Sequence, residues 1–233
     1  MKVRIKFSKH GPIRFIGHLD VMRYFQKAMR RSEIDIAYTT GFSPHQIMSF
    51  AAPLGVGLES NGEYMDVELN SMVSSADIVE RLNAVGAEGI KVLSAKVLPD
   101  NAGNAMASVA AADYTIRFRE GREPKFDYKS ALKDFYAKEQ ILVTKETKKN
   151  TLEVDLKPGI YKLEIREDAI YMLVDASSSG NIKPAMVMEA FMAENNELLQ
   201  ENAFTVTRED TYLNTGTALN PVFEPLDQIG SIV

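Results

Sequence analysis

The sequence of 233 residues contains no cysteine. The chain therefore forms no disulfide bond and offers no thiolate for an iron–sulfur cluster or a zinc site. It also lacks any run that approaches the ~20 apolar residues of a membrane helix, and its first residues contain no apolar segment of signal-peptide length. We expect a soluble, cytoplasmic protein with no cofactor and no membrane partner.

Local motifs for phosphate and metal chemistry are missing as well. There is no GxxxxGKS or GxxxxGKT loop, no strand-linked GxGxxG and no HExxH-like pair. A zinc site from His18, His45 and one of Glu63, Asp66 or Glu68 is conceivable, but nothing in the spacing brings these residues together. We therefore predict no metal site, and the residues alone name no reaction.

Positive charge is concentrated near the N-terminus. The net formal charge is −5, yet residues 1–50 hold nine Lys and Arg against three acids. This segment carries +6, which leaves −11 on the other 183 residues. All three histidines also lie in the positive segment. An asymmetry of this size indicates an anionic partner.

The first half of the chain predicts four strands and two helices. Apolar residues alternate with charged ones at residues 3–7, as in a half-buried strand, and a helical period runs from His18 to about Ser32. Further elements are expected as strands at 34–38, 64–69 and 90–97, a helix at 78–82, and a Gly- and Pro-rich loop at 39–62. The βαββαβ order is typical of a ferredoxin-like domain, which we assign to residues 1–98.

The second half repeats this order with an addition. Residues 99–112 are small and nearly uncharged, and we interpret them as a linker to a second domain at 113–233. There we expect helices at 127–138 and 184–195, and strands at 114–119, 141–146, 151–156, 160–166, 170–174 and 204–208. The prediction is an α+β protein of two ferredoxin-like halves. The second half is elaborated with an extra β-hairpin and ends in an irregular tail that packs on the first half.

Three stretches are more specific than these patterns: KFSKHGPIRFIGHLDVMRYFQKAMRR (6–31), GFSPHQIMSFAAPLGVGLESNGEYMDVEL (41–69) and KKNTLEVDLKPG (148–159). Together they resemble the radical-SAM-linked family of uncharacterised bacterial proteins. Members are fused to, or encoded beside, an enzyme of the radical S-adenosylmethionine (SAM) class. The resemblance covers nearly the whole chain and implies an accessory protein. Ribosomal-protein and ribonuclease genes are typical neighbours of the family, which implies RNA as the substrate class.

The missing cysteines bear on this resemblance. A radical SAM enzyme holds its iron–sulfur cluster with three cysteines, and this chain has none. The resemblance therefore implies that a separate radical SAM enzyme, encoded nearby, is the partner and performs the radical chemistry. This chain would bind the substrate, and we do not expect it to be a catalyst of its own.

The predicted helix after residue 17 provides the candidate binding surface. Its basic residues fall within about 100° of arc on the side opposite the apolar stripe. Such a row of cations tracks a phosphate backbone. The alternative is a solvated face that makes surface ion pairs of ~0–1 kcal/mol each. The predicted nucleic-acid or anion-binding residues are Lys6, Arg14, Arg23, Lys27, Arg30 and Arg31.

Two histidines are candidates for catalysis or substrate contact. His18 opens the predicted helix, and His45 lies in the Gly- and Pro-rich loop, where functional residues concentrate. Imidazole transfers protons near neutral pH. We interpret Phe42, Ser43, His45 and Ser49 as a loop that meets the substrate or the partner. The alternative is that both histidines are structural caps or surface groups.

These observations predict an accessory, RNA-binding protein that acts with a separate radical SAM enzyme. Two alternatives remain open. One is a stand-alone, metal-independent endoribonuclease that uses histidine. The other is a protein-docking scaffold whose positive face meets an acidic partner without nucleic acid.

Overall fold

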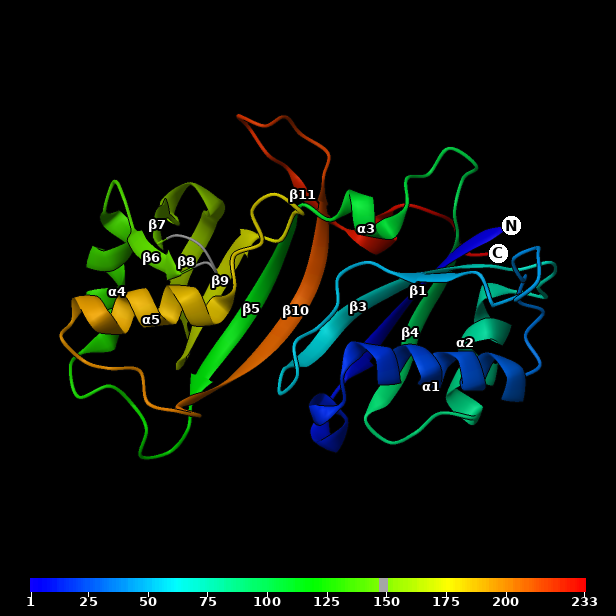
Figure 1. Ribbon diagram of the computed structural model, residues 1–233, viewed down its shortest axis with the longest axis horizontal. Coiled ribbons are helices and arrows are strands. Elements are labelled where there is room, and N and C mark those ends of the chain that lie inside the picture. The colour runs from blue at the N-terminus through cyan, green and yellow to red at the C-terminus, as the bar shows by residue number, and fades with distance from the viewer. Residues whose placement is uncertain (147–150) are drawn as a thin grey trace. The chain divides into compact units, whose positions relative to one another are not determined.

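The computed structural model describes residues 1–146 and 151–233 (Figure 1). The chain divides into two compact units. Unit 1 comprises Met1–Ala110 and Arg208–Val233, and unit 2 comprises Ala111–Thr207. The strand β10 (Phe204–Asn214) begins in unit 2 and ends in unit 1.

Unit 1 is built around a central strand, β1, that pairs antiparallel with β3 on one side and β4 on the other. The short β2 pairs with the end of β3. Because Val3, Ile5 and Phe7 alternate along β1, they share one face, and each is at most 1% exposed. These strands are β1 (Lys2–Lys9), β2 (Met48–Phe50), β3 (Glu59–Glu68) and β4 (Ile90–Val97).

Helices of unit 1 cover that apolar face. Phe25 of α1 and Ile78 of α2 belong to the same core as Phe7, and the rings of Phe7 and Phe25 lie 4.6 Å apart. Full burial of such side chains stabilises the fold by ~1.5–3 kcal/mol each. Ser74 caps α2 by accepting a hydrogen bond from the N–H of Asp77 over 3.1 Å. The helices are η1 (Gly11–Phe15), α1 (His18–Arg31), α2 (Ser75–Ala84) and α3 (Ala105–Ser108).

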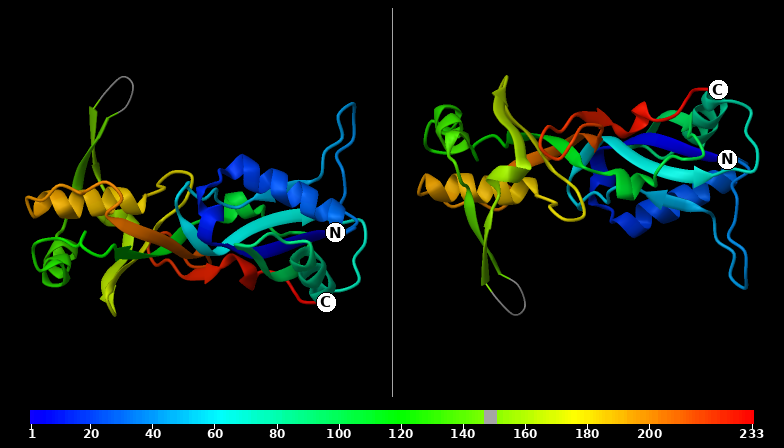
Figure 2. Two further views of the ribbon diagram at one scale, coloured as in Figure 1. Left: turned by 90° about the horizontal axis from the view of Figure 1, so that it is seen from below. Right: turned by 90° about the horizontal axis from the view of Figure 1, so that it is seen from above.

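The other face of β1 is covered by the C-terminal segment, which contains β11 (Phe223–Pro225) and η3 (Leu226–Gln228). The Arg4 guanidinium, whose residue is 1% exposed, donates to the carbonyl of Leu226 over 2.9 Å. The N–H of Ser75 donates to the carbonyl of Val233 over 2.8 Å, and Figure 2 shows the two termini close together. The tail therefore belongs to unit 1.

The division into units differs from the predicted domains 1–98 and 113–233 with a linker at 99–112. Residues 208–233 lie in unit 1 because the end of β10 and the tail pack there. Most of the predicted linker lies there too. Ala105 is fully buried, and its N–H donates to Asp66 Oδ2 over 2.9 Å. Small residues in this segment permit close packing rather than a free connection.

Unit 2 contains an antiparallel sheet in the order β10–β5–β9–β8, joined through the first residues of β10. A separate hairpin pairs β6 with β7. The rings of Phe135 in α4 and Phe191 in α5 lie 5.3 Å apart in its core. Its elements are β5 (Ala111–Phe118), α4 (Tyr128–Ala137), β6 (Leu142–Glu146), β7 (Thr151–Asp155), η2 (Lys157–Gly159), β8 (Ile160–Arg166), β9 (Ala169–Asp175) and α5 (Pro184–Glu194).

The α+β class is confirmed, and the strands expected at 141–146 and 151–156 form the hairpin of β6 and β7. The expected strand at 34–38 is wrong, since only single bridges form at Ile36 and Tyr38. The short strand β2, which lies inside the predicted loop at 39–62, pairs with the C-terminal part of β3 instead. Apolar alternation at 34–38 reflects burial of Ile34 and Ile36 rather than strand pairing. The assignment of a ferredoxin-like fold to each half stays a prediction.

No helix in the part of the chain that the structure describes is both long and apolar enough to cross a bilayer.

Candidate anion-binding surface

The helix α1 begins directly after Gly17 and has two unlike faces. Val21, Phe25, Ala28 and Met29 are buried in the core of unit 1. Their spacing of three and four residues places them on one side of the helix. The packing of this apolar stripe determines which side chains of α1 point outward.

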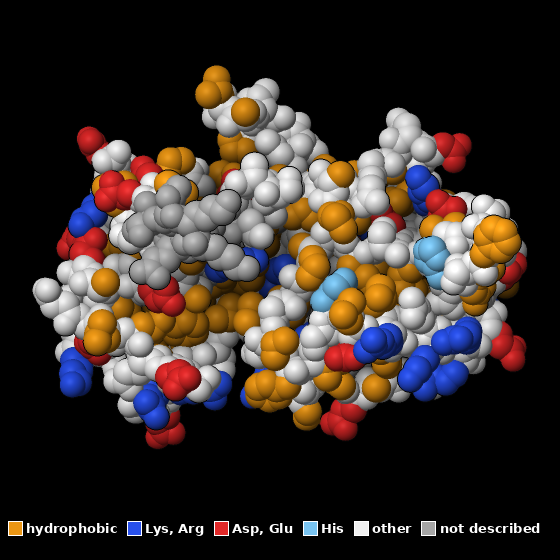
Figure 3. All heavy atoms as spheres, viewed as in Figure 1, with side chains coloured by type: hydrophobic (Ala, Val, Ile, Leu, Met, Phe, Trp, Pro, Cys, Tyr) orange, Lys and Arg blue, Asp and Glu red, His pale blue; other side chains and the backbone are white. Residues whose placement is uncertain are grey.

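The outward side of α1 carries four exposed cations, Arg23, Lys27, Arg30 and Arg31. At 100° per residue they span about 100° of arc. We call these four residues the basic face. Figure 3 shows Lys and Arg side chains gathered in the region of α1. The cations that the sequence places on this helix therefore lie on the same exposed side of it.

The cations of the basic face have few ionic partners among the described residues. Arg23 pairs with Asp20 over 3.2 Å, and their side chains are 67% and 58% exposed, so the pair contributes only ~0–1 kcal/mol. Arg30 Nε donates to a backbone carbonyl over 3.3 Å, and Arg31 Nη2 donates to the carbonyl of Val85 over 3.0 Å. These carbonyls accept hydrogen bonds without cancelling charge. Among the described residues, the four cations thus make a single ion pair, with Asp20.

The spacing of these cations costs helix stability. Arg23, Lys27 and Arg31 follow each other at four-residue intervals, and like charges so placed destabilise a helix by ~0.2–0.5 kcal/mol per pair. Arg30 and Arg31 stand in the last turn, where cations gain from the helix dipole. Arg23 and Lys27 lie in the middle and have no such gain. The helix dipole therefore does not account for these two residues.

Lys6 and Arg14 are not part of the basic face. Lys6 Nζ lies 2.6 Å from Asp210 Oδ2, and the Arg14 guanidinium lies 3.0 Å from Glu59 Oε1. Lys6 is on the central strand β1, whose second face is covered, so its charge is matched by an acid from β10. The sequence places Asp210 204 residues away from Lys6, which is why the alternation in β1 did not reveal the pairing.

Most of the predicted substrate loop lies between Tyr38 and Gln46, next to α1. Tyr38 and Gln46 form a bridge, and Thr39 and His45 exchange hydrogen bonds of 2.9 Å and 3.1 Å inside it. Gln46 Nε2 donates to the carbonyl of Gln26 over 3.3 Å, which ties the loop to the middle of α1.

The residues of that predicted loop separate in the structure. Phe42, Ser43 and His45 are exposed between Tyr38 and Gln46, and Phe42 is fully exposed. Ser49 instead lies in β2, opposite Asp66 of β3. The side chains of Phe42, His45 and Tyr38 are thus exposed on a loop that is anchored to α1.

The two candidate histidines have different environments. The His18 ring packs edge-on against Phe50 at 5.1 Å and lines a small cavity of about 10 Å³ with Lys9 and Glu63. His45 Nδ1 lies 3.0 Å from the hydroxyl of Thr39. Among the described residues, no hydrogen bond, ion pair or ring contact joins the two histidines. Neither has a carboxylate partner there that would make an acid–base pair.

A buried polar cluster in unit 1 was missed from the sequence. Arg208 Nε and Nη2 donate to Glu63 Oε1 over 2.8 Å and 2.6 Å, with side chains 4% and 7% exposed. Lys9 Nζ donates to the carbonyl of Ile16 over 3.0 Å. Burial lowers the pKa of Lys9, with Glu63 opposing and Arg208 reinforcing the shift. The 10 Å³ cavity beside the cluster holds about one water, so we assign the cluster to stability.

A second part of the same cluster centres on Tyr64, which is 2% exposed. Its hydroxyl donates to Asp210 Oδ1 over 2.6 Å. Burial, with the nearby Asp210 and Asp227 carboxylates, raises the pKa of Tyr64 far above its ordinary value. No sequence signal links β3 to β10 at this distance along the chain.

The described residues contain no group of three or more histidine or acidic side chains placed to hold a metal ion. Lys148 and Lys149, in the third of the stretches that carry the family resemblance, lie outside the described residues.

Comparison with known proteins identifies a family. The family described as "Uncharacterized protein conserved in bacteria (DUF2344)" matches residues 2–184. Since this match covers most of the chain, the protein belongs to that family. A comparison with proteins of curated function finds none that matches.

Among solved structures, the chain is similar to a chain in the crystal structure of a Cbf5-Nop10-Gar1 complex. The similarity has a TM-score of 0.47 with 11% sequence identity, and it covers 90% of this chain and 48% of that chain. The protein thus spans about half the length of that chain. A likeness at this level identifies no shared function.

Proposed function

We propose that this protein is an RNA-binding accessory subunit that acts with a separate radical SAM enzyme, and that RNA phosphates bind to the basic face of α1. The observation that carries the proposal is the row of Arg23 and Lys27 in the middle of α1. Their like-charge spacing costs helix stability, and Asp20 is the one ion-pair partner that the described residues offer them. A polyanion removes that cost and gains affinity through counterion release.

The loop between Tyr38 and Gln46 supports RNA over a protein partner. Its fully exposed Phe42 and the half-exposed Tyr38 offer ring faces on a loop that Gln46 ties to α1. Base–aromatic stacking contributes ~1–3 kcal/mol per base. Cations that hold phosphates next to rings that hold bases are the combination used by proteins that bind single-stranded nucleic acid.

The radical SAM partner rests on the family resemblance of the three stretches and on the missing cysteines. A chain without cysteine supplies no ligand for the enzyme's cluster. Its contribution is therefore to hold or orient the substrate. His18 and His45 have no acid–base partner among the described residues, so no catalytic step is proposed for them.

We also propose a ferredoxin-like fold for each unit. Unit 1 has β2, β3, β1 and β4 side by side in that order, and unit 2 has β8, β9, β5 and β10. In both, the strand that comes first along the chain is an inner one, as in the order expected of βαββαβ domains.

The test of RNA binding uses charge reversal. A labelled pool of single-stranded RNA is titrated with the protein and with Arg23→Glu/Lys27→Glu, and fluorescence anisotropy is measured. The variant is expected to bind roughly 10- to 100-fold more weakly at moderate salt. The matched control, Lys125→Glu/Lys133→Glu, makes the same change of charge on exposed residues of unit 2 and is expected to bind nearly as well as the unmodified protein.

Equal binding by the α1 variant and the unmodified protein would show that RNA does not bind to the basic face. Binding of an acidic protein but not RNA would favour the docking-scaffold alternative. The partner is tested by pull-down from native cells with and without ribonuclease. Recovery of the neighbouring radical SAM enzyme supports the accessory role, and its absence from both samples contradicts it.

A further inference from the structure

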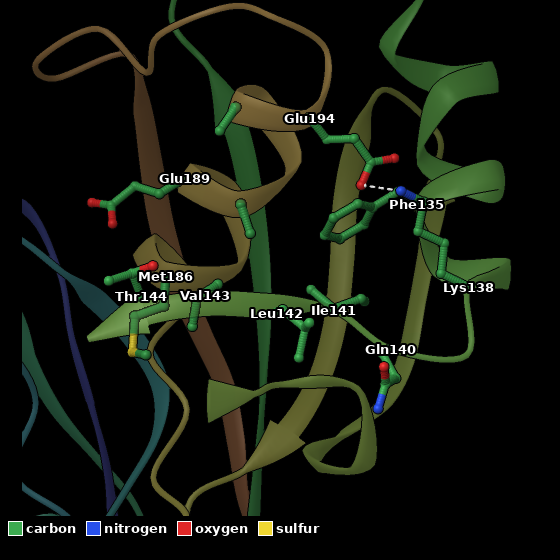
Figure 4. A pocket seen from close by; sticks show the side chains of 12 residues that line it. Phe135, Lys138, Gln140, Ile141, Leu142, Val143, Thr144, Met186, Glu189 and Glu194 are labelled. Carbon is green, nitrogen blue, oxygen red and sulfur yellow. Dashed lines mark ion pairs between the residues drawn. The ribbon is translucent and has the colours of Figure 1, made fainter. Parts of the chain in front are cut away.

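A large groove in unit 2 lies between α5, β6 and the end of α4 (Figure 4). Its volume is about 880 Å³, and its apolar floor includes Phe135 and Ile141. None of the residues predicted from the sequence as a site lies here. The groove therefore has no role in the proposed RNA-binding surface.

One wall of the groove is formed by the outer side of α5. The inner side of α5 buries Val187, Met188, Phe191 and Met192 in the core. The outer side lines the groove with an apolar stripe of Met186, Ala190 and Ala193, flanked by the acids Glu189 and Glu194. Burial of such an apolar stripe against a partner is favourable.

The other wall is a strand edge. Among the described residues, β6 pairs only with β7, in the register Leu142↔Asp155 and Thr144↔Glu153. The N–H of Leu156 donates to the carbonyl of Ile141 over 2.8 Å, so Ile141 points its backbone groups at β7. Because these groups alternate in an antiparallel pair, the N–H and C=O of Leu142 and Thr144 point away from β7.

The charges of the groove are unequal. Glu194 is paired with Lys138, whose Nζ lies 2.6 Å from Glu194 Oε2. Glu189 makes no ion pair with any described residue. Figure 4 shows Glu189 and the Lys138–Glu194 pair at opposite ends of the drawn side chains. Glu189 is therefore available to pair with a cation of a ligand.

We propose that this groove binds an extended peptide segment of a partner protein, which adds a strand to the open edge of β6. The backbone of the segment bonds to Leu142 and Thr144, its alternate apolar side chains pack on Met186 and Ala190, and a Lys or Arg reaches Glu189. The alternating backbone groups of the edge favour a peptide over a compact small molecule, which would leave them unpaired.

The experiment selects short peptides from a random displayed library on the full chain and measures affinity by fluorescence polarisation. The expected binders alternate apolar residues and carry a Lys or Arg. A binder N-methylated on the residues that face β6 loses its donors and is expected to bind at least about tenfold more weakly. This comparison uses the unmodified protein, so no variant has to fold.

Three variants complete the test. Thr144→Pro removes an N–H that points away from β7, so the hairpin is kept while the edge is blocked. Glu189→Arg reverses the free acid, and Glu201→Arg is its control on an exposed residue that does not line the groove. The first two are expected to weaken binding about tenfold and the control to leave it unchanged.

Failure to enrich any peptide overturns the proposal. So does equal binding of the N-methylated peptide, because strand addition requires those donors. A dimer that Thr144→Pro dissociates would assign the edge to a second copy of this chain, and it would also overturn the proposal. RNA binding by the Thr144→Pro variant is expected to be normal, so the outcome is independent of the proposed function.

Discussion

Two neighbouring elements of unit 1, β1 and α1, each carry four Lys or Arg side chains, but these side chains have different partners. In β1, Arg4 and Lys6 are matched by Asp66 at 2.8 Å and Asp210 at 2.6 Å. In α1, the four cations of the basic face make one ion pair among the described residues, with the exposed Asp20. The position of a cation in the fold, and not the number of cations nearby in the sequence, determines whether it is paired within the protein or available to a ligand.

The difference follows from what surrounds each element. A buried cation without a partner costs several kcal/mol, so the cations of β1 require acids from β3 and β10. An exposed cation keeps its water and needs no partner. Its cost is only the repulsion from neighbouring cations, and that repulsion is what a polyanion relieves. The predictions below test the two halves of this contrast.

The largest effect is expected at the buried pair of Glu63 and Arg208. Glu63→Ala leaves the Arg208 guanidinium buried without its carboxylate and removes the negative charge nearest Lys9. We expect the free energy of unfolding to fall by ~3–5 kcal/mol. Urea unfolding monitored by circular dichroism measures it. A loss below ~1 kcal/mol would mean that the cluster is solvated rather than buried.

A smaller loss is expected for Tyr64→Phe. The substitution removes the hydroxyl that donates to Asp210 over 2.6 Å and keeps the ring. Because Asp210 retains Lys6, we expect a loss of ~1–2 kcal/mol in the free energy of unfolding. The same urea titration checks this value. An unchanged midpoint would show that the hydroxyl contributes nothing to the cluster.

The pH dependence of stability is expected to report on Lys9. Burial lowers its pKa in the folded state below the ordinary value of 10.5. In the window between the folded pKa and 10.5, the unfolded chain binds more protons, so stability rises with pH. Lys9→Met is expected to lack this increment.

The measurement for Lys9 is urea unfolding of both proteins from about pH 8 to about pH 10. The difference between the two proteins matters, because other groups that titrate in this range are common to both. Parallel curves for the two proteins would show that Lys9 has an ordinary pKa.

The smallest effect on stability, and of opposite sign, is expected on α1. Lys27→Gln keeps helix propensity but removes the like-charge pairs with Arg23 and Arg31. We expect the free energy of unfolding to rise by about 0.5 kcal/mol while RNA binding weakens. Thermal unfolding and anisotropy measure the two quantities. A loss of stability would show that Lys27 supports the fold, which removes the main argument for the basic face.

The sequence predicts well where the partners of a residue are local. Alternation identifies β1, and the apolar period of α1 correctly leaves Arg23 and Lys27 outside. The strands expected at 141–146 and 151–156 also correspond to β6 and β7. In each case, burial follows from neighbours within a few residues.

Prediction fails where a distant segment decides the outcome. The charge of Lys6 favours the binding surface, and its partner Asp210 cannot be foreseen because it lies 204 residues away along the chain. The strand at 34–38 was expected from its apolar residues, but β2 pairs with β3 instead. The predicted domain boundary differs from the division into units because the tail after β10 packs in unit 1. The groove beside α5 combines segments from three elements and has no motif of its own.

The central claim is that RNA phosphates contact the cations of α1 and not those of β1. The direct measurement is the slope of RNA affinity against salt concentration on logarithmic axes, in which each single-strand phosphate contact contributes about 0.7. We expect Arg23→Gln/Lys27→Gln to lower the magnitude of the slope by roughly 1.4, and Lys6→Met and Lys125→Gln/Lys133→Gln to leave it unchanged. An unchanged slope in the α1 variant, or an equal fall in Lys6→Met, would contradict the claim.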